Sequence, residues 1–215
     1  MPTSDTDRSL SVHETAELAA VSRHAVEKAI ENGIVGVERR GGGGRSAGGT
    51  ARRVPLACVA YLGALKRAEL IDLPVKHKRA LWKGVRSTFP MSEGASAKRR
   101  GERPDPVEFA RGATLDVAAL AGDLIERAER YVAARAKHIA IDPEIKGGTP
   151  VIRGTRMSVY AVRGRIEGGE SVDDILEDNP DLSREAIETA LTFAATHPVR
   201  GRPASGRPWR AGCAA

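Results

Sequence analysis

Two helix starts lie close together near the N-terminus, and their spacing constrains the fold more than any other feature of this chain. The segment Ser11-Val12-His13-Glu14 is typical of a capping box, in which the serine binds the backbone of the first turn and the glutamate reaches back. Ser22 caps a second helix, which we expect to end at Asn32 before Gly33. Two short helices joined by a tight turn predict a helix-turn-helix unit.

The residues that follow favour a wing and further helices. Residues 34–54 alternate basic and small side chains around two glycine runs, a pattern that suits two short strands joined by a long tip. Segments rich in alanine and leucine begin at Pro55 and Pro74 and predict two more helices, which would cover the first pair. We therefore expect residues 10–88 to form a winged helix-turn-helix domain.

The second half of the chain divides into four parts. Residues 89–114 combine Pro, Gly, Ser and charge without periodicity, which predicts a linker. An alanine-rich helix over 115–137, either a connector or a pairing element, leads into a hairpin and three helices over 138–198. The tail, residues 199–215, is basic and cannot form a core alone.

The composition favours small helical cores. Only 4% of the residues are aromatic, so Ala, Leu, Val and Ile must supply most of the buried surface. Cys58 and Cys213 form no CxxC pair, which indicates neither a zinc site nor a disulfide framework, and no segment has the pattern of a signal or a membrane span. We expect a cytoplasmic protein of mainly α class, built from two small helix-turn-helix domains.

The run from Ile141 to Arg156, with its order Asp-Pro, Gly-Gly, Pro and Gly-Thr-Arg, resembles the small bacterial domain family of unknown function DUF433. The residues that carry the motif are Gly147, Gly148, Pro150, Arg153, Gly154, Thr155 and Arg156. This resemblance implies an antitoxin-like protein with a homeodomain-like domain, often encoded beside a ribonuclease toxin of the PIN class. Residues 10–85 are similar to MerR-type winged helix-turn-helix domains, and the two parts joined resemble the longer antitoxins of the VapB45 kind.

Backbone chemistry alone accounts for most of this motif. Its three glycines suit turns with positive φ, Pro150 suits a stiff strand edge, and Thr155 suits a cap ahead of the next helix. Arg153 and Arg156 leave two interpretations open, a structural role and the binding of a phosphate or a partner carboxylate.

Candidate DNA-binding side chains lie on the second helix and beside the wing tip. The net charge of +6 favours an anionic partner, and a helix in this position enters the major groove with its N-terminal residues nearest the bases. Basic residues beside the glycine tip suit phosphate or minor-groove contact. The candidates are Arg23, His24, Lys28, Arg39, Arg40, Arg52 and Arg53. The alternatives are a solvated helix face and a basic loop without a ligand.

The tail carries the candidate toxin contacts. Because guanidinium groups pair bidentately with carboxylates, arginines would compete with Mg²⁺ in a PIN-type nuclease site, while a tryptophan would anchor the rim. The candidates are Arg200, Arg202, Arg207, Trp209 and Arg210. The alternative is a disordered end that adds only solubility or non-specific affinity for DNA.

No pattern of a catalytic or cofactor site is present. The acids Asp173, Asp174, Glu177 and Asp178 begin a helix, where they favour the helix dipole, and we expect them to be a solvated face rather than a metal site. Neither a P-loop nor an HExxH pair occurs, so we expect no enzymatic activity, no cofactor and no metal.

The sequence therefore favours the antitoxin of a type II toxin–antitoxin system. It would bind operator DNA, repress its own operon and neutralise a PIN-type ribonuclease, as a homodimer or as a hetero-oligomer with the toxin. The alternative is a stand-alone transcription regulator without a toxin partner.

Overall fold

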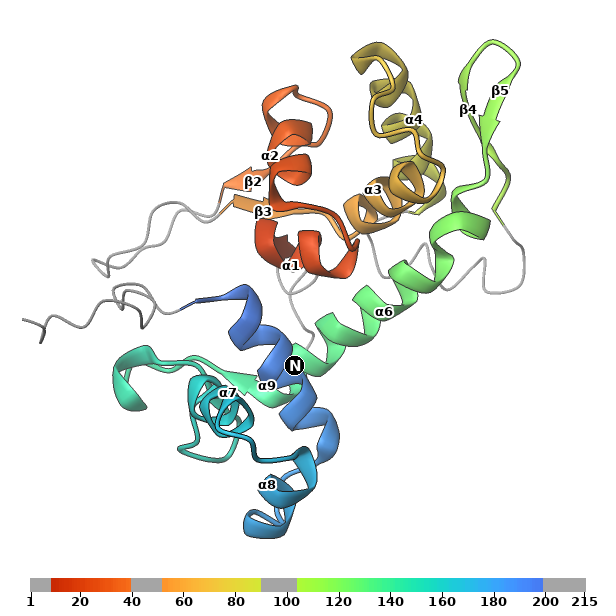
Figure 1. Cartoon of the computed structure of the whole chain (residues 1–215). Helices are drawn as coiled ribbons and strands as arrows, with labels where there is room; N and C mark the ends of the chain where they lie inside the picture. The colour runs from red at the N-terminus through yellow and green to blue at the C-terminus, as the bar shows by residue number, and fades with distance from the viewer. Residues whose placement is uncertain (1–8, 40–51, 90–103, 199–215) are drawn as a thin grey trace, which may run out of the picture.

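A computed structural model describes residues 9–39, 52–89 and 104–198, and helices dominate this part of the chain (Figure 1). The predicted mainly α class is confirmed. The α-helices are α1 (Val12–Leu18), α2 (Arg23–Glu31), α3 (Ala57–Arg67), α4 (Val75–Thr88), α6 (Val117–His138), α7 (Val159–Glu167), α8 (Val172–Asp178) and α9 (Arg184–Thr196). None of the helices in these three ranges is long and apolar enough to span a membrane.

The strands are short and form three small antiparallel sheets. They are β1 (Leu10–Ser11), β2 (Glu38–Arg39), β3 (Arg52–Val54), β4 (Val107–Ala110), β5 (Ala113–Leu115), β6 (Ile139–Ala140) and β7 (Val151–Ile152). The first sheet has the order β1-β3-β2, while β4 pairs with β5 and β6 with β7. The two predicted wing strands correspond to β2 and β3. Sequence reasoning missed β1, which is only two residues long.

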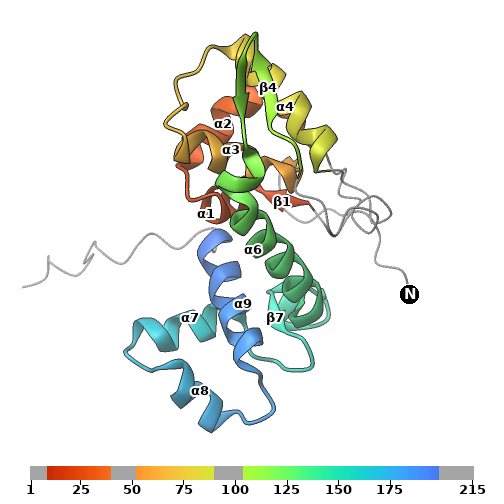
Figure 2. The same ribbon diagram turned by 90° about the vertical axis from the view of Figure 1, so that its right-hand side faces the viewer.

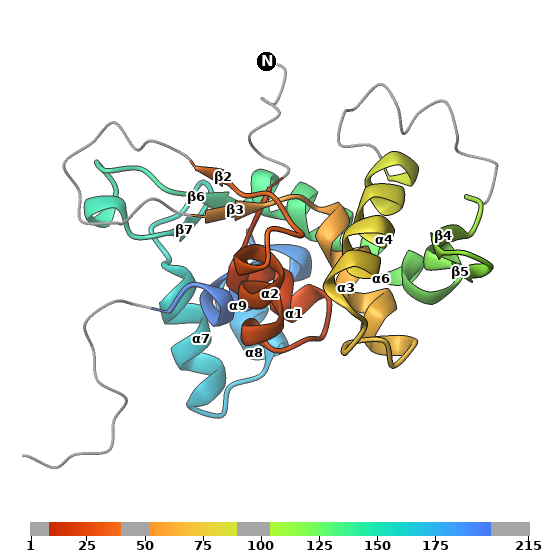
Figure 3. The same cartoon turned by 90° about the horizontal axis from the view of Figure 1, so that it is seen from above.

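The first hydrophobic core joins residues from Leu10 to Val132. Every residue of α3 from Ala57 to Leu65 is buried, because α6 packs along one side of this helix and the α1–α2 pair lies on another (Figures 1 and 3). A Cβ on Gly63 would lie 2.3 Å from Leu124 Cδ1, so the glycine permits the close approach of α3 and α6. The first core therefore includes α6 as far as Val132.

The β4–β5 hairpin lies within the residues expected to be a linker. It packs against α4, where a Cβ on Gly84 would lie 2.1 Å from Val107 Cγ1. Val107 and Leu115 belong to the first hydrophobic core. The apolar residues of this segment thus pack into the first core. Their spacing is too irregular to predict a strand from the sequence.

The second hydrophobic core lies among β6, β7, α7, α8 and α9. Serine side chains cap the three helices: Ser158 begins α7, Ser171 begins α8 and Ser183 begins α9. The hairpin and the three helices predicted over residues 138–198 are present. One prediction is wrong: Thr155 does not cap α7, because its hydroxyl donates to the Ile152 carbonyl at 2.9 Å and the helix begins only after Ser158.

Two helices hold the two cores together. The long helix α6 runs from the first core to the second, and α9 packs against it (Figure 2). The C-terminal end of α9 also contacts α1, so residues far apart in the sequence meet at this junction (Figure 1). The described part of the chain consequently forms two packed cores with a shared boundary.

Candidate nucleic-acid interface

The α1–α2 pair is held by caps and a tight turn. The capping box of α1 is complete, with Glu14 N donating to Ser11 Oγ at 3.2 Å and Ser11 N donating to a Glu14 carboxylate oxygen at 2.7 Å. Ala20, with φ 53°, turns the chain, and Ser22 Oγ accepts from Ala25 N at 3.2 Å to begin α2. Val26 and Ala29 of α2 are buried, so the opposite face of this helix points outward.

The outward face of α2 carries three of the predicted DNA-binding residues. Arg23, His24 and Lys28 are all exposed. Arg23 Nε donates to Glu27 Oε1 at 2.7 Å, and Arg23 Nη1 lies 3.1 Å from His13 Nε2 on α1. Because the Arg23 side chain remains 58% exposed, this ion pair orients the guanidinium without removing it from solvent.

The predicted wing residues do not all have the same surroundings. Arg39 of β2 pairs in register with Arg52 of β3, while Arg40 lies outside the described residues. Arg53 turns toward the protein, because its Nη1 lies 3.8 Å from Glu14 Oε2. Arg53 therefore takes part in the junction between the two cores.

A buried carboxylate organises this junction. Glu14 is fully buried and accepts from Tyr131 Oη at 2.9 Å and from Arg135 Nη1 at 2.7 Å, both on α6. Burial raises the pKa of Glu14, but the Arg135 guanidinium and the Ser11 backbone outweigh burial and lower the pKa below its ordinary value. Glu14 is thus an ionised group with partners from α1 and α6. Sequence reasoning assigned it only to the capping box.

His197, directly after α9, belongs to the same junction. Its ring stacks on Phe193 with centroids 4.1 Å apart, and Glu14, Arg53 and Arg135 are the charges that act on it. Burial, the largest effect, lowers the pKa of His197, and the two arginines lower it further against the opposing effect of Glu14. The neutral imidazole is therefore the favoured form in the folded protein.

A cavity of about 440 Å³ separates α2 from α3 and α4. Its polar lining includes His24 and Lys28 of α2 together with Lys78 of α4, and Leu62 and Leu65 form part of its apolar wall. The cavity therefore places Lys78 of α4 near two of the predicted DNA-binding residues.

The motif of the second core is mostly structural. Gly147, Gly148 and Gly154 have φ of 62°, 81° and 80°, which confirms the predicted turns. Arg153 donates to the carbonyls of Ala136, Lys137 and Ile139 at 3.0–3.2 Å and so satisfies the C-terminal end of α6. The structural interpretation accounts for Arg153.

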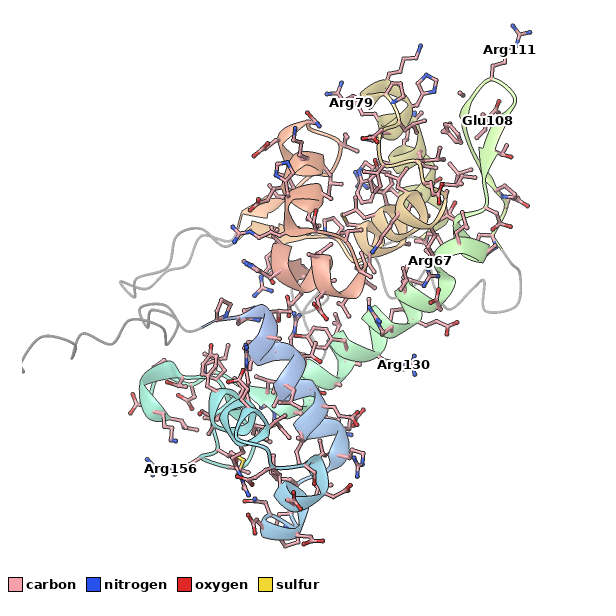
Figure 4. The ribbon with its side chains drawn as sticks, in the orientation of Figure 1. Arg67, Arg79, Glu108, Arg111, Arg130 and Arg156 are labelled. Carbon is pink, nitrogen blue, oxygen red and sulfur yellow. The ribbon has the colours of Figure 1, made fainter. Side chains whose placement is uncertain are left out.

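Residues 139–194 match the family described as "Protein of unknown function (DUF433)". The match begins at β6 and ends within α9, so the DUF433 segment coincides with the second core. Of its predicted motif residues, Arg156 is exposed and points away from the ribbon at the lower end of the molecule, whereas Pro150 is half-buried before β7 (Figure 4).

Two known proteins resemble the chain over a wider range. The chain is 40% identical over 89 residues to "Uncharacterized protein y4eO" of Sinorhizobium fredii (strain NBRC 101917 / NGR234), and the match covers 41% of this chain and 40% of that protein. The chain thus spans less than half the length of this relative. The X-ray crystal structure of Rv2018 from Mycobacterium tuberculosis has 18% sequence identity and a TM-score of 0.37, with 85% of this chain and 96% of the other covered.

Three of the four acids expected to form a solvated face have a cap or an ion pair. Asp174 completes a capping box with Ser171, and Arg184 pairs with Asp173. Arg165 pairs with Asp178. Within residues 9–39, 52–89 and 104–198, no group of three or more His, Cys, Asp or Glu side chains is arranged to hold a metal ion. The predicted toxin contacts, Arg200, Arg202, Arg207, Trp209 and Arg210, lie outside the described residues.

Proposed function

We propose that the protein binds DNA as a MerR-like winged helix-turn-helix, with α2 in the major groove and β2–β3 as the wing. The observation that carries this proposal is the exposed first turn of α2, which presents Arg23 and His24 and contains no acid. Anionic groups are attracted to the N-terminus of a helix, and here the side chains add positive charge to that end. The arrangement fits base edges and phosphates approached by the start of a recognition helix.

We further propose that the chain is the antitoxin of a type II toxin–antitoxin system and represses its own operon. The DUF433 segment has one hairpin and three helices around a hydrophobic core of its own. In this proposal it is a homeodomain-like domain that would support dimerisation or the docking of a PIN-type ribonuclease. The arginine-rich tail, residues 199–215, would occupy the nuclease site. In this proposal the chain needs neither a cofactor nor a catalytic residue.

The DNA-binding proposal is tested with the promoter DNA of the protein's own gene. We expect Arg23→Gln to raise the Kd by about tenfold or more, because a lost bidentate base contact has an effect of this size. The matched control is Arg130→Gln, an exposed arginine of α6 on the side of the molecule away from α2 (Figure 4). Equal binding by both variants and the unsubstituted chain would contradict the placement of α2 in the groove.

The antitoxin proposal is tested by co-expression with the product of the neighbouring reading frame. RNA cleavage is measured with the full chain and with a chain that ends at Pro198. Silencing by the full chain alone assigns inhibition to the tail, whereas silencing by both assigns it to the DUF433 segment. If neither chain binds or silences the neighbouring protein, the antitoxin proposal is refuted and a stand-alone regulator takes its place.

A further inference from the structure

One face of α4 carries a stripe of four cations. Lys76, Arg79, Lys83 and Arg86 are separated by three, four and three residues, so they lie along one side of the helix, and all four are exposed. The apolar side of α4, with Leu81, Trp82 and Val85, is buried in the first core. We call these four residues the α4 stripe. The helix contains neither Asp nor Glu.

Folding accounts for only part of these charges: Arg79 bonds the C-cap carbonyl of α2, and Arg86 lies in the last turn of α4, where a cation favours the helix dipole. The first turn of α4 holds Lys76 together with His77 and Lys78 and no acid, although cations at this end oppose the helix dipole and destabilise the helix. No carboxylate in the described part of the chain pairs with a residue of the α4 stripe. Exposed cations that have no carboxylate partner are suited to an external anion.

The α4 stripe lies beside the recognition helix. Arg79 Nη2 donates to the carbonyl of Asn32, the C-cap of α2, at 2.8 Å. Lys78 of α4 lines the same cavity as His24 and Lys28 of α2. Figure 4 shows Arg79 between α4 and α2, and Arg111 at the tip of the β4–β5 hairpin beyond α4, both at the upper end of the molecule. The basic surface of α2 therefore continues onto α4.

We propose that the α4 stripe binds the phosphate backbone of duplex DNA next to the groove that α2 enters. This inference rests on the proposed function and adds a second contact surface to it. The ten-residue step from Lys76 to Arg86 spans about 15 Å of helix, long enough for the cations to follow several phosphates. The exposed neighbours on this side are Val75, Ala80 and Ser87. None of them is aromatic, so the aromatic anchors typical of a protein interface are missing, whereas phosphate contacts need only charge and donors.

The test is the salt dependence of binding to a DNA duplex of unrelated sequence, measured with the full chain. The variant Lys76→Gln with Arg86→Gln removes one lysine and one arginine from the ends of the stripe. The matched control, Arg130→Gln with Lys146→Gln, removes the same charges from exposed positions on α6 and in the DUF433 segment. We expect the stripe variant to lower the slope of log K against log salt by about 1.8, two contacts at about 0.9 each, and the control to leave it unchanged.

Three results would overturn the inference, and each has a different meaning. An unchanged slope in the stripe variant, with the unsubstituted chain bound normally, removes α4 from the interface and leaves α2 in place. If the slope of log K against log salt falls equally in the stripe variant and in the control, the effect is due to net charge. If the unsubstituted chain binds no duplex at any salt concentration, the proposed function fails together with this inference. Thermal unfolding of both variants verifies that they fold, since the substituted side chains are all exposed.

Discussion

Replacement of Glu14 by Gln is expected to destabilise the protein strongly. The Glu14 carboxylate is fully buried and accepts hydrogen bonds from Ser11 N, Tyr131 and Arg135. The amide keeps the size of the side chain but removes the charge, so the nearly buried Arg135 guanidinium loses its counter-ion. Removal of one partner from a buried ion pair costs about 3–5 kcal/mol, and we expect about 3 kcal/mol because the amide oxygen still accepts one bond.

Thermal unfolding followed by circular dichroism measures this effect. For a chain of this size, 3 kcal/mol corresponds to a fall in Tm of about 6–12 °C. Glu27→Gln is the control, because the Glu27 carboxylate pairs with Arg23 at the surface, where a pair contributes about 0.2–1 kcal/mol. If Glu14→Gln costs no more than this control, Arg135 has an adequate alternative partner and the reasoning is refuted.

A double substitution separates the ion pair from simple loss of packing. Arg135→Met removes the cation and keeps an apolar stem, and together with Glu14→Gln it removes both members of the buried ion pair. We expect the double variant to be more stable than the sum of the two single effects by about 0.5–3 kcal/mol. Strict additivity would show that Glu14 and Arg135 act independently in the folded protein.

The remaining predictions concern pH, glycine packing and the α6 cap. The pKa of His197 is lowered in the folded protein, so the unfolded chain binds the proton more tightly. The free energy of unfolding should therefore decline as pH falls below 6.5. Denaturant titrations at several pH values should show a smaller decline for His197→Gln. Gly84→Ala should lower the Tm because the new Cβ meets Val107, whereas Gly164→Ala, with open space around its Cβ, should stabilise α7 by about 0.5–1 kcal/mol. Arg153→Ala should cost about 0.5–1.5 kcal/mol in urea unfolding, since carbonyls at the end of α6 exchange the guanidinium donor for water.

Local signals explain which elements were predictable from the sequence. Ser22, Ser171 and Ser183 each begin a helix where a serine precedes a helical pattern, because capping depends only on residues within one turn. The turns at Gly147 and Gly154 were equally visible, since their positive φ reflects the absence of a Cβ. The predicted cap at Thr155 was wrong because a hydroxyl near a turn can donate to a carbonyl as readily as it can cap a helix.

The features that the sequence did not reveal all depend on tertiary contacts. Tyr131 and Arg135 lie more than one hundred residues from Glu14, and no periodicity connects them. The β4–β5 hairpin was predicted as part of a linker because residues 89–114 combine Pro, Gly, Ser and charge without periodicity, yet Val107 is buried where Gly84 leaves space for it. Both cases require knowledge of which helices pack together.

The α4 stripe is a different case, because its signal was present in the sequence. The spacing of Lys76, Arg79, Lys83 and Arg86 is helical, but the same residues on an isolated helix are only a solvated face. They become a candidate DNA contact because α4 lies beside α2. The bond from Arg79 to Asn32 and the cavity lined by both His24 and Lys78 show that the two helices are neighbours. A pattern of charged residues in a sequence therefore identifies a candidate binding surface only when the tertiary structure shows which of these residues lie on the same side of the molecule.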